Sequence, residues 1–292
     1  MDLEQYKNWI GRTQSNEDVA SPFPPRALIA TLDSGDAEPK TGDALPPCWH
    51  WLYFLETAPA SQIGPDGHAK RGPFLPPVPL PRRMWAGSRL QFPAAIKVGE
   101  AIRRDSEIVS VEPKSGSTGQ MVFVTVRHKI SGNGKLAIVE EHDIVYRQAA
   151  QPGDKAPQRN LTPKPAPNDS QWRKDVVPDP VLLFRFSALT FNGHRIHYDL
   201  PYVTEEEGYP GLIVHGPLMG LMMLELGRRT LPQRQVTAYE FRALSPVFHT
   251  TPFTVCAKPQ ETGPNGATGN GLVTWIARHD GALTQQGKVT FA

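Results

Sequence analysis

The chain has 292 residues, enough for one large domain or two domains of ordinary size, each with a buried core. Its 31 lysine and arginine residues against 29 aspartate and glutamate residues give a formal net charge of +2, so the composition gives no support for nucleic-acid binding. The two cysteines, Cys48 and Cys256, are too far apart for a zinc ribbon and give no disulfide framework. The sequence has neither a leader-like start nor a run of about 18 apolar residues, so we expect a cytoplasmic protein without a membrane partner.

The first predicted element is a helix over residues 48–58, CWHWLYFLETA, which is rich in aromatic side chains. A proline-rich segment follows at residues 71–87, RGPFLPPVPLPRRMWAG. Its apolar side chains predict an ordered, polyproline-like wrap on the surface of the first half of the chain. The alternative for this segment is a proline-rich ligand of a signalling domain.

Three runs with β-branched residues and alternating polarity follow this wrap, at residues 88–113, 119–131 and 135–147. Turns that contain glycine separate the runs, so they predict an antiparallel meander. The next stretch, residues 151–180, is rich in proline and poor in aliphatic side chains, and we interpret it as a linker. The predicted organisation is therefore an N-terminal domain over residues 1–150, the linker, and a C-terminal domain over residues 181–292.

The second half begins with a predicted helix over residues 181–190, which the Asn192-Gly193 pair should end. A capping box, TEEE at residues 204–207, predicts one further helical turn. The main helix is predicted over residues 217–229, PLMGLMMLELGRR, with Gly216 as its cap. Its composition leaves almost no polar face, so we expect it to be buried on nearly all sides.

Strand-like runs close the chain at residues 237–260, 271–281 and 283–292. The order of one helix followed by strands therefore occurs twice. A long helix laid across an antiparallel sheet is an α+β arrangement. We predict a duplicated α+β fold with two antiparallel sheets, each wrapped around a central helix.

The stretch FNGHRIHYD, directly after the helix that opens the second half, is unusually rich in functional groups. Asn192, His194 and His197 form one polar station, and His215 with Gly216 forms a second at the start of the main helix. Free backbone N–H groups gather at that helix start, with the positive end of the helix dipole behind them. Such a start can stabilise an oxyanion. We expect the two stations to face one pocket.

Each of these residues also has a simpler interpretation. His194, His197 and Asp199 could bind a divalent metal, but no further ligand follows at a familiar spacing, and we expect no metal. Taken alone, His194 or His197 could hold a turn together. The presence of Asn192 and of an oxyanion-ready helix start favours proton transfer for His197. For His215, packing is favoured over proton transfer.

The block FRFSALTFNGHRIHYDLPYVTEEEGYPGLIVHGPLMGLMMLEL resembles the hydratase signature of MaoC-like hot-dog proteins, the R-specific enoyl-CoA hydratases and 3-hydroxyacyl-thioester dehydratases. With WIGRT near the start and the wrap ending in MWAG, the resemblance covers nearly all of the chain. The chain is similar to the two-domain branch that contains itaconyl-CoA and mesaconyl-C4-CoA hydratases and the mitochondrial dehydratase of fatty-acid synthesis. The resemblance implies a double hot-dog fold that holds a CoA thioester in a tunnel between its halves.

The signature of this family usually reads D-x-N-P-(I/L)-H, and its Asp and His act on water and on the α-carbon proton. Registering its last two residues on Ile196 and His197 keeps the histidine but places Asn192 at the Asp and His194 at the Asn. An amide can orient water but cannot accept its proton. The resemblance therefore implies that His197 is the base alone, or with help from Asp199 or from the first half.

The implied activity is the reversible hydration of a 2-enoyl-CoA to a 3-hydroxyacyl-CoA, with a short dicarboxylic acyl group such as itaconyl or mesaconyl and without a cofactor. His197 would deprotonate water held by Asn192, and the Gly216 N–H would bind the thioester oxygen. Further contacts to the acyl-CoA are expected from side chains in both halves: Arg82, Trp85, His194, Ile213 and His215. Arg82 or Arg83 could receive the free carboxylate of the acyl group or a phosphate of CoA, and the alternative for both is a solvated charge at the end of the wrap.

Two other functions stay open, because hot-dog folds also serve as acyl-CoA thioesterases and as acyl-CoA-binding proteins without activity. Thioesterases of this fold place an Asp or Glu near the central helix, and this sequence offers none there before Glu225. We expect one active site per chain, since nothing like NGHRIH precedes the first predicted helix, and we expect His50 and His68 to be dispensable. The partner expected besides acyl-CoA is a second copy of the chain in a homodimer.

Overall fold

The computed structural model of the protein describes residues 2–72, 74–116, 119–148, 163–261 and 268–292. The chain forms two compact units. The first consists of Met1–Trp85, Pro93–Asp154 and Phe184–Arg195, and the second consists of Ala86–Phe92, Lys155–Leu183 and Ile196–Ala292. The predicted linker at residues 151–180 lies partly outside the described residues, so the predicted domain boundaries stay a prediction.

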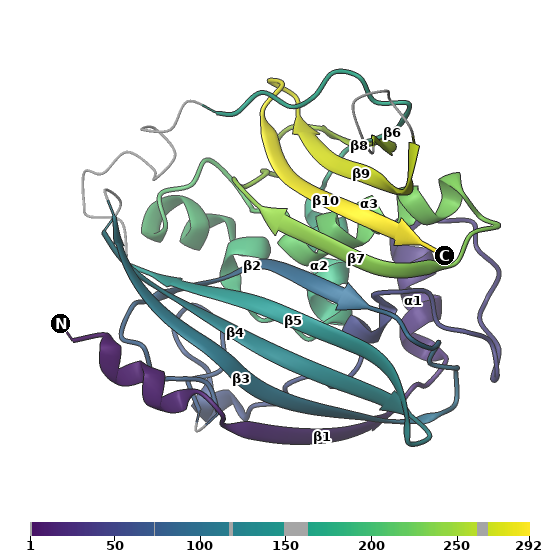
Figure 1. Cartoon of the computed structure of the whole chain (residues 1–292). Coiled ribbons are helices and arrows are strands. Elements are labelled where there is room, and N and C mark those ends of the chain that lie inside the picture. Colours follow the sequence, from purple (N-terminus) through teal and green to yellow (C-terminus); the bar gives the residue numbers. More distant parts are fainter. Residues whose placement is uncertain (1, 73, 117–118, 149–162, 262–267) are drawn as a thin grey trace. The chain divides into compact units, whose positions relative to one another are not determined.

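The first unit contains a run of antiparallel strands in the order β1-β3-β4-β5 (Figure 1): β1 (Thr13–Val19), β3 (Ala101–Gly116), β4 (Gly119–Gly132) and β5 (Lys135–Arg147). The alternation in the sequence explains this sheet, because Val122, Val124 and Val126 of β4 are all buried on one face. They form one apolar core with Ile108 and Tyr146 of the neighbouring strands. The predicted meander is confirmed.

Several elements at the start of the chain have no counterpart in the sequence-based prediction. They are the 3₁₀ helix η1 (Glu4–Trp9), the edge strand β1 and the helix α1 (Phe23–Leu32). Tyr6 of η1 is buried in the core beneath β3 and β4, which anchors this end of the chain. A further 3₁₀ turn, η3 (Ala60–Gln62), comes later in this unit.

The proline-rich segment is an ordered wrap, as predicted. Val78 and Leu80 are buried and belong to the apolar core of the first unit. The Arg71 guanidinium donates to the Leu80 carbonyl and lies over the Tyr146 ring at 5.0 Å. The end of the segment already belongs to a strand, β2 (Arg82–Gln91), which therefore begins earlier than the alternation predicts.

The helix predicted over residues 48–58 is wrong. The segment forms only a short 3₁₀ turn, η2 (Trp49–Leu52), and then continues extended. Cys48 and Phe54 both have left-handed backbones, with φ of 69° and 56°, and an α-helix cannot continue through such residues. The aromatic side chains instead enter the core as separate anchors, since Trp49 is 2% exposed.

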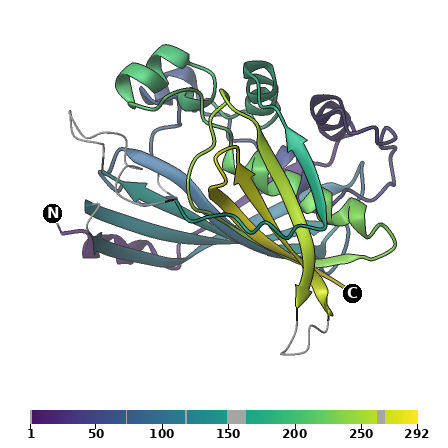
Figure 2. The same cartoon turned by 90° about the horizontal axis from the view of Figure 1, so that it is seen from above.

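The second unit repeats the strand order in the sheet β7-β10-β9-β8-β6: β6 (Trp172–Val176), β7 (Val236–Ala243), β8 (Phe253–Glu261), β9 (Thr268–Arg278) and β10 (Leu283–Phe291). Residues 87–91 of β2 pair with β7. The main helix α3 (Gly216–Thr230) lies against one face of these strands (Figure 2). Its Leu218, Met223 and Leu224 have no exposed surface, so the predicted buried helix is confirmed. Strand β6 lies within the stretch interpreted as a linker.

Each unit contains an equivalent pair of backbone hydrogen bonds. In the second unit this pair lies just before the start of α3. In the first unit they join Leu45 N to Ile96 O and Val98 N to Asp43 O, and in the second Val214 N to Val247 O and His249 N to Leu212 O. These bonds align Pro46 with His215 and Pro47 with Gly216. Together with the common strand order they confirm the predicted duplication.

The helix predicted over residues 181–190 is present as α2 (Pro180–Leu189), and it starts where the Asp179 carboxylate accepts the Leu182 N–H at 2.7 Å. It ends at Leu189, and the left-handed residue that follows it is Phe191, with φ of 49°, and not a residue of the Asn-Gly pair. A 3₁₀ turn, η4 (Arg195–His197), and a π-helical turn, η5 (Tyr202–Glu206), follow. The predicted capping box does not form, because the Thr204 hydroxyl donates to the Leu200 carbonyl. No helix in the described part of the chain has the length and apolarity needed to cross a membrane.

Candidate active site

The start of α3 carries the polar groups that the sequence analysis expects there. His215 is the N-cap, with ψ of 129°, so Gly216 and Pro217 are the first two helical residues and the cap lies one residue earlier than predicted. The side chain of Gln285, which is completely buried on β10, donates to the Gly216 carbonyl at 3.2 Å. Gly216 still offers its own N–H at the positive end of the helix dipole, which suits an oxyanion.

His197 is buried and its orientation is fixed by a backbone carbonyl. Its Nδ1 lies 2.7 Å from the carbonyl oxygen of Ile213, and Ile213 N in turn donates to the Ile196 carbonyl at 3.0 Å. Because a carbonyl only accepts, Nδ1 carries a hydrogen, so in the neutral imidazole the lone pair is on Nε2. Nε2 is therefore the nitrogen of His197 that can accept a proton.

His215 lies directly against His197. The two imidazole rings are stacked, with centroids 3.6 Å apart and 17° between their planes. His215 has no exposed surface and His197 is 7% exposed. Within the second unit the structure therefore brings together His197, His215, Ile213 and Gly216, four of the predicted site residues.

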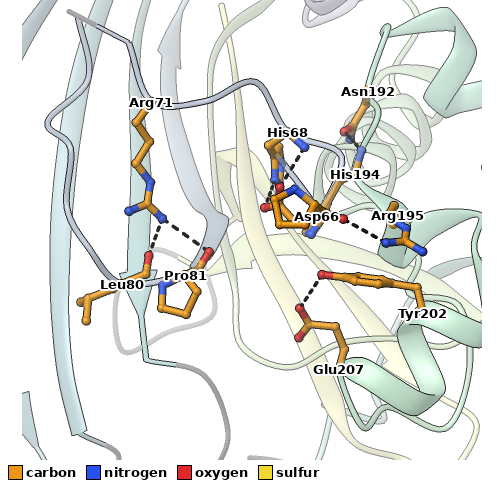
Figure 3. A network of polar contacts seen from close by, with 11 residues as sticks. Asp66, His68, Arg71, Leu80, Pro81, Asn192, His194, Arg195, Tyr202 and Glu207 are labelled. Carbon is orange, nitrogen blue, oxygen red and sulfur yellow. Dashed lines mark hydrogen bonds and ion pairs between the residues drawn. The ribbon is translucent and has the colours of Figure 1, made fainter. Parts of the chain in front are cut away.

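Asn192 and His194 form a turn within the first unit (Figure 3). The Asn192 side-chain oxygen accepts the backbone N–H of His194 at 3.0 Å, which closes an Asx turn. One lone pair of that oxygen is therefore used by the backbone, and the amide NH₂ can donate to water. The His194 ring projects from this turn towards the side chain of His68, with ring centroids 4.0 Å apart.

Sequence reasoning missed the contribution of Asp66 and His68 (Figure 3). The Asp66 carboxylate accepts both the backbone N–H and the Nδ1–H of His68, at 3.0 and 2.9 Å. Burial lowers the pKa of His68 in spite of this carboxylate, so its imidazole is neutral. Burial alone would raise the pKa of Asp66, but the hydrogen bonds from His68 and the charge of Arg83 outweigh it and lower that pKa. The result is an oriented Asp–His pair beside His194.

The loop that carries Asp66 is held tightly against the signature residues. The Asp66 carbonyl accepts the backbone N–H of Arg195 at 2.9 Å, and the Pro65 carbonyl accepts its guanidinium at 3.0 Å. Gly67 has φ of +89°, and a Cβ atom there would lie 1.8 Å from the Gly193 carbonyl oxygen. Only glycine at position 67 allows this approach. No periodic pattern in the sequence signals the contact, because loop residues far apart in the chain make it.

Asp66, His68 and His194 also have the donor types of a divalent-metal site. Their ligand atoms lie within 4.8 Å of one another, and two imidazoles with one carboxylate suit a transition metal. The hydrogen bond between Asp66 and His68 accounts for their closeness without an ion. The expectation that the chain needs no metal stays a prediction.

A cavity of about 180 Å³ lies in the first unit, and Trp85 is part of its wall. The Trp85 ring stacks on His142 at 4.1 Å and meets the edge of Trp51 at 5.0 Å. Arg82, the other predicted residue of this region, is half-buried and is not among the residues that line the cavity. Thr190, at the end of α2, lines it two residues before Asn192.

The polar wall of this cavity is a second group that sequence reasoning missed. Glu140 is buried and binds the Nε2 of His50 at 3.0 Å and the indole N–H of Trp51 at 3.1 Å. Burial alone would raise the pKa of Glu140, but the hydrogen bond and charge of His50 hold it well below its usual range. Burial lowers the pKa of His128 to about 3 and that of His142 to about 4, so both rings are neutral. Charged and polar side chains on the inward face of β4 and β5 were the available signal.

Two comparisons with known sequences cover most of the chain. The family profile described as hydroxyacyl-thioester dehydratase type 2 matches residues 48–249. The chain is 45% identical over 275 residues to the mesaconyl-C(4)-CoA hydratase of Chloroflexus aurantiacus, which covers 92% of this chain and 96% of that protein. It is 32% identical over 245 residues to the mitochondrial hydroxyacyl-thioester dehydratase type 2 of Schizosaccharomyces pombe, covering 75% and 79% of the two chains.

Solved structures share the fold at low sequence identity. A MaoC-like dehydratase superposes with a TM-score of 0.68 at 16% identity, over 98% of this chain and all of the other. A Mycobacterium tuberculosis protein described as having a double hot-dog fold superposes with a TM-score of 0.59 at 13% identity, over 97% and 96% of the two chains. The predicted double hot-dog fold is confirmed.

Proposed function

Because the chain belongs to the hydroxyacyl-thioester dehydratase type 2 family, we propose that it catalyses the reversible hydration of a 2-enoyl-CoA whose acyl group is short and dicarboxylic. The chain is an enzyme of the hydratase and dehydratase class. The relative from Chloroflexus aurantiacus is named for a substrate with a dicarboxylic acyl group, mesaconyl-C(4)-CoA, and this supports the choice of a dicarboxylic substrate. A mesaconyl-C4 or itaconyl group fits this description.

The observation that carries the proposal is the fixed tautomer of His197. The Ile213 carbonyl holds the hydrogen on Nδ1, at 2.7 Å, and leaves the Nε2 lone pair as a base. In the hydration direction Nε2 takes one proton from water while the water oxygen bonds to the β-carbon. The electron pair of the C=C bond moves towards the thioester carbonyl, and the imidazolium then gives the proton to the α-carbon. One residue can thus complete the addition without a net change in its own protonation.

The developing charge on the thioester oxygen needs a donor that is already in place. We assign this role to the N–H of Gly216, at the first turn of α3. The amide NH₂ of Asn192 is assigned to the water, since its side-chain oxygen already accepts the His194 N–H. Such a preorganised donor typically contributes about a hundredfold to the rate.

Residues from both halves of the chain are proposed to contact the substrate. Trp85, His194 and Ile213 are proposed to contact the acyl-CoA, and Arg82 is proposed for a phosphate of CoA, for which a guanidinium is well suited. His215 has no exposed surface, so it is proposed to act through its stacking on His197 and not by touching the substrate. The reaction as written needs no cofactor and no metal. We propose one active site per chain, a cytoplasmic location and assembly as a homodimer.

The test is a hydration assay on a panel of enoyl-CoA thioesters, followed by loss of the enoyl absorbance. We expect His197→Ala to lower kcat by about a hundredfold or more, because the variant loses the proposed base. His279→Ala is the matched control, since His279 is exposed on a turn and should leave turnover unchanged. Near-normal turnover of His197→Ala would overturn the assignment of the base.

The alternative activity, hydrolysis of the thioester, is distinguished in the same assay. A thioesterase releases free CoA thiol, which a thiol reagent detects, whereas a hydratase removes the enoyl absorbance without thiol. The described residues include Glu225 on α3, but its carboxylate is engaged by Arg228 at 2.7 Å and by Arg229 at 3.3 Å. These ion pairs favour the hydratase over a Glu225-dependent thioesterase. An acyl-CoA-binding protein would give neither signal.

A further inference from the structure

The cavity of the first unit has a small volume and a mixed lining. About 180 Å³ is less than the roughly 300–1,000 Å³ of pockets for drug-sized ligands, so the cavity suits a group of a few carbon atoms. Trp51 and Trp85 supply apolar walls, and His142 and Arg104 supply polar groups. Nothing in the proposed reaction uses Arg104.

Arg104, on β3, lacks the partners that a half-buried guanidinium normally has. Its Nε is buried and has no hydrogen-bond partner among the described residues. Its Nη2 makes only long contacts, 3.4 Å to the Phe54 carbonyl and 3.5 Å to the Asn16 side chain, and the guanidinium lies 5.0 Å from the centre of the Phe54 ring. No ion pair of Arg104 is found in the described ranges of the chain. A cation removed from water in this way is stabilised by an anion.

The two carboxylates that line the cavity do not meet this need. Both Glu140 oxygens accept hydrogen bonds from Trp51, and Oε2 also binds His50. Glu56 is exposed, so solvent screens its charge. Burial lowers the pKa of Arg104, and the charges of these two carboxylates offset that effect only in part. The guanidinium nevertheless stays charged at neutral pH, because an arginine side chain does not deprotonate in proteins.

We propose that this cavity is a carboxylate subsite, in which Arg104 binds the free carboxylate of the short dicarboxylic acyl group. The proposal rests on the proposed hydratase function and names the residue that selects its substrate. A guanidinium can bind a carboxylate through two parallel N–H donors, which a monocarboxylic acyl chain cannot use. The neutral rings of His128 and His142 add donors without adding charge, and Thr190 places the cavity next to the signature residue Asn192 along the chain.

The experiment compares two substrates of similar length on matched variants. Mesaconyl-C4-CoA carries the carboxylate, and crotonyl-CoA does not. For Arg104→Gln we expect kcat/KM for mesaconyl-C4-CoA to fall by about tenfold or more, mainly through KM, while crotonyl-CoA changes by less than about threefold. Arg104→Lys should be more active than Arg104→Gln, because lysine keeps the positive charge. It should remain less active than wild type, because lysine cannot donate two parallel hydrogen bonds to one carboxylate. Arg103→Gln is the control, since Arg103 is exposed and pairs with Asp105.

A direct binding measurement keeps the proposal testable if turnover of crotonyl-CoA is too slow. Calorimetric titration with succinyl-CoA and butyryl-CoA, which the enzyme cannot hydrate, should show that wild type prefers succinyl-CoA and that Arg104→Gln has lost this preference. Equal losses on both ligands, with a normal thermal unfolding curve, would overturn the carboxylate subsite and leave the hydratase intact. A wild-type protein that hydrates neither thioester would instead remove the proposed function.

Discussion

The imidazoles of His197 and His215 are stacked face to face at 3.6 Å, and the outer ring of the pair is also the one held by the Ile213 carbonyl. One contact fixes the direction of the His197 nitrogens, and the other fixes the plane of its ring. His215 is completely buried, so its ring supports one face of the proposed base from inside the protein. The arrangement assigns His215 a positioning role.

We therefore expect His215→Phe and His215→Ala to differ. Phenylalanine keeps an aromatic face under His197, so kcat should stay within about tenfold of wild type. Alanine opens a cavity there, which should lower the free energy of unfolding by about 2–4 kcal/mol and lower kcat further. Steady-state kinetics and urea unfolding on both variants test this. Equal damage by the two substitutions would show that the nitrogens of His215 matter, and not its face.

Acid should destabilise the first unit through its neutral histidines. The folded-state pKa of His142 is lowered to about 4 and that of His128 to about 3, both by burial, against about 6.5 in the unfolded chain. Between these values the unfolded chain binds protons that the folded chain does not bind. Stability therefore falls as the pH drops below about 6.5, by about 3 kcal/mol for each histidine by pH 4.

Urea unfolding followed by tryptophan fluorescence at about pH 7.5 and about pH 4.5 measures this effect, since Trp85 stacks on His142. The variant His142→Gln removes one of the titrating groups, so its stability should depend less steeply on pH than that of wild type. Glu140, whose pKa is lowered, adds its own loss only below about pH 4.5. A wild-type stability that is flat over this range would contradict the burial of these rings.

A methyl group at Gly67 should disturb the signature loop. Gly67→Ala places Cβ 1.8 Å from the Gly193 carbonyl oxygen, at a residue with φ of +89°. Gly42→Ala is a matched control, because Gly42 has φ of +93° and open space around it. We expect Gly42→Ala to cost about 1 kcal/mol of stability from the backbone alone. Gly67→Ala should cost more and should also reduce kcat, whereas equal effects on stability and no effect on kcat would show that the close approach is unimportant.

Removal of metal ions should leave the activity unchanged. The proton transfers assigned to His197 use only side-chain and backbone groups, and Asp66 is already hydrogen-bonded to His68. Dialysis against a chelator, followed by the hydration assay, tests this. If activity disappears and returns with added zinc or manganese, then Asp66, His68 and His194 bind a catalytic ion and the expectation of a metal-free enzyme is wrong.

The strands and the main helix were predictable because their periodicity is local. Val122, Val124 and Val126 alternate with half-buried residues, and the apolar run of α3 has no polar face. The segment at residues 48–58 misled the prediction, since its aromatic side chains are compatible with a helix, whereas the left-handed backbones of Cys48 and Phe54 are fixed by tertiary packing.

The site was predictable only where its residues lie in one stretch. His197 and Gly216 follow from the signature and from the helix start. Asp66 and His68 reach the signature through backbone hydrogen bonds between two loops, which leave no periodic trace. Glu140 was detectable from the sequence. It is a charged residue on the inward face of two strands that are otherwise rich in apolar residues, and it is in register with His128.

The alignment of Pro47 with Gly216 has a consequence for the number of active sites in the chain. In the first unit, the equivalent of the N–H that we propose as the oxyanion donor is a proline nitrogen, which carries no hydrogen. The first unit therefore cannot present the same donor at that position. Gly216→Pro should remove the proposed donor from the second unit, whereas Pro47→Gly alone should not create a second active site.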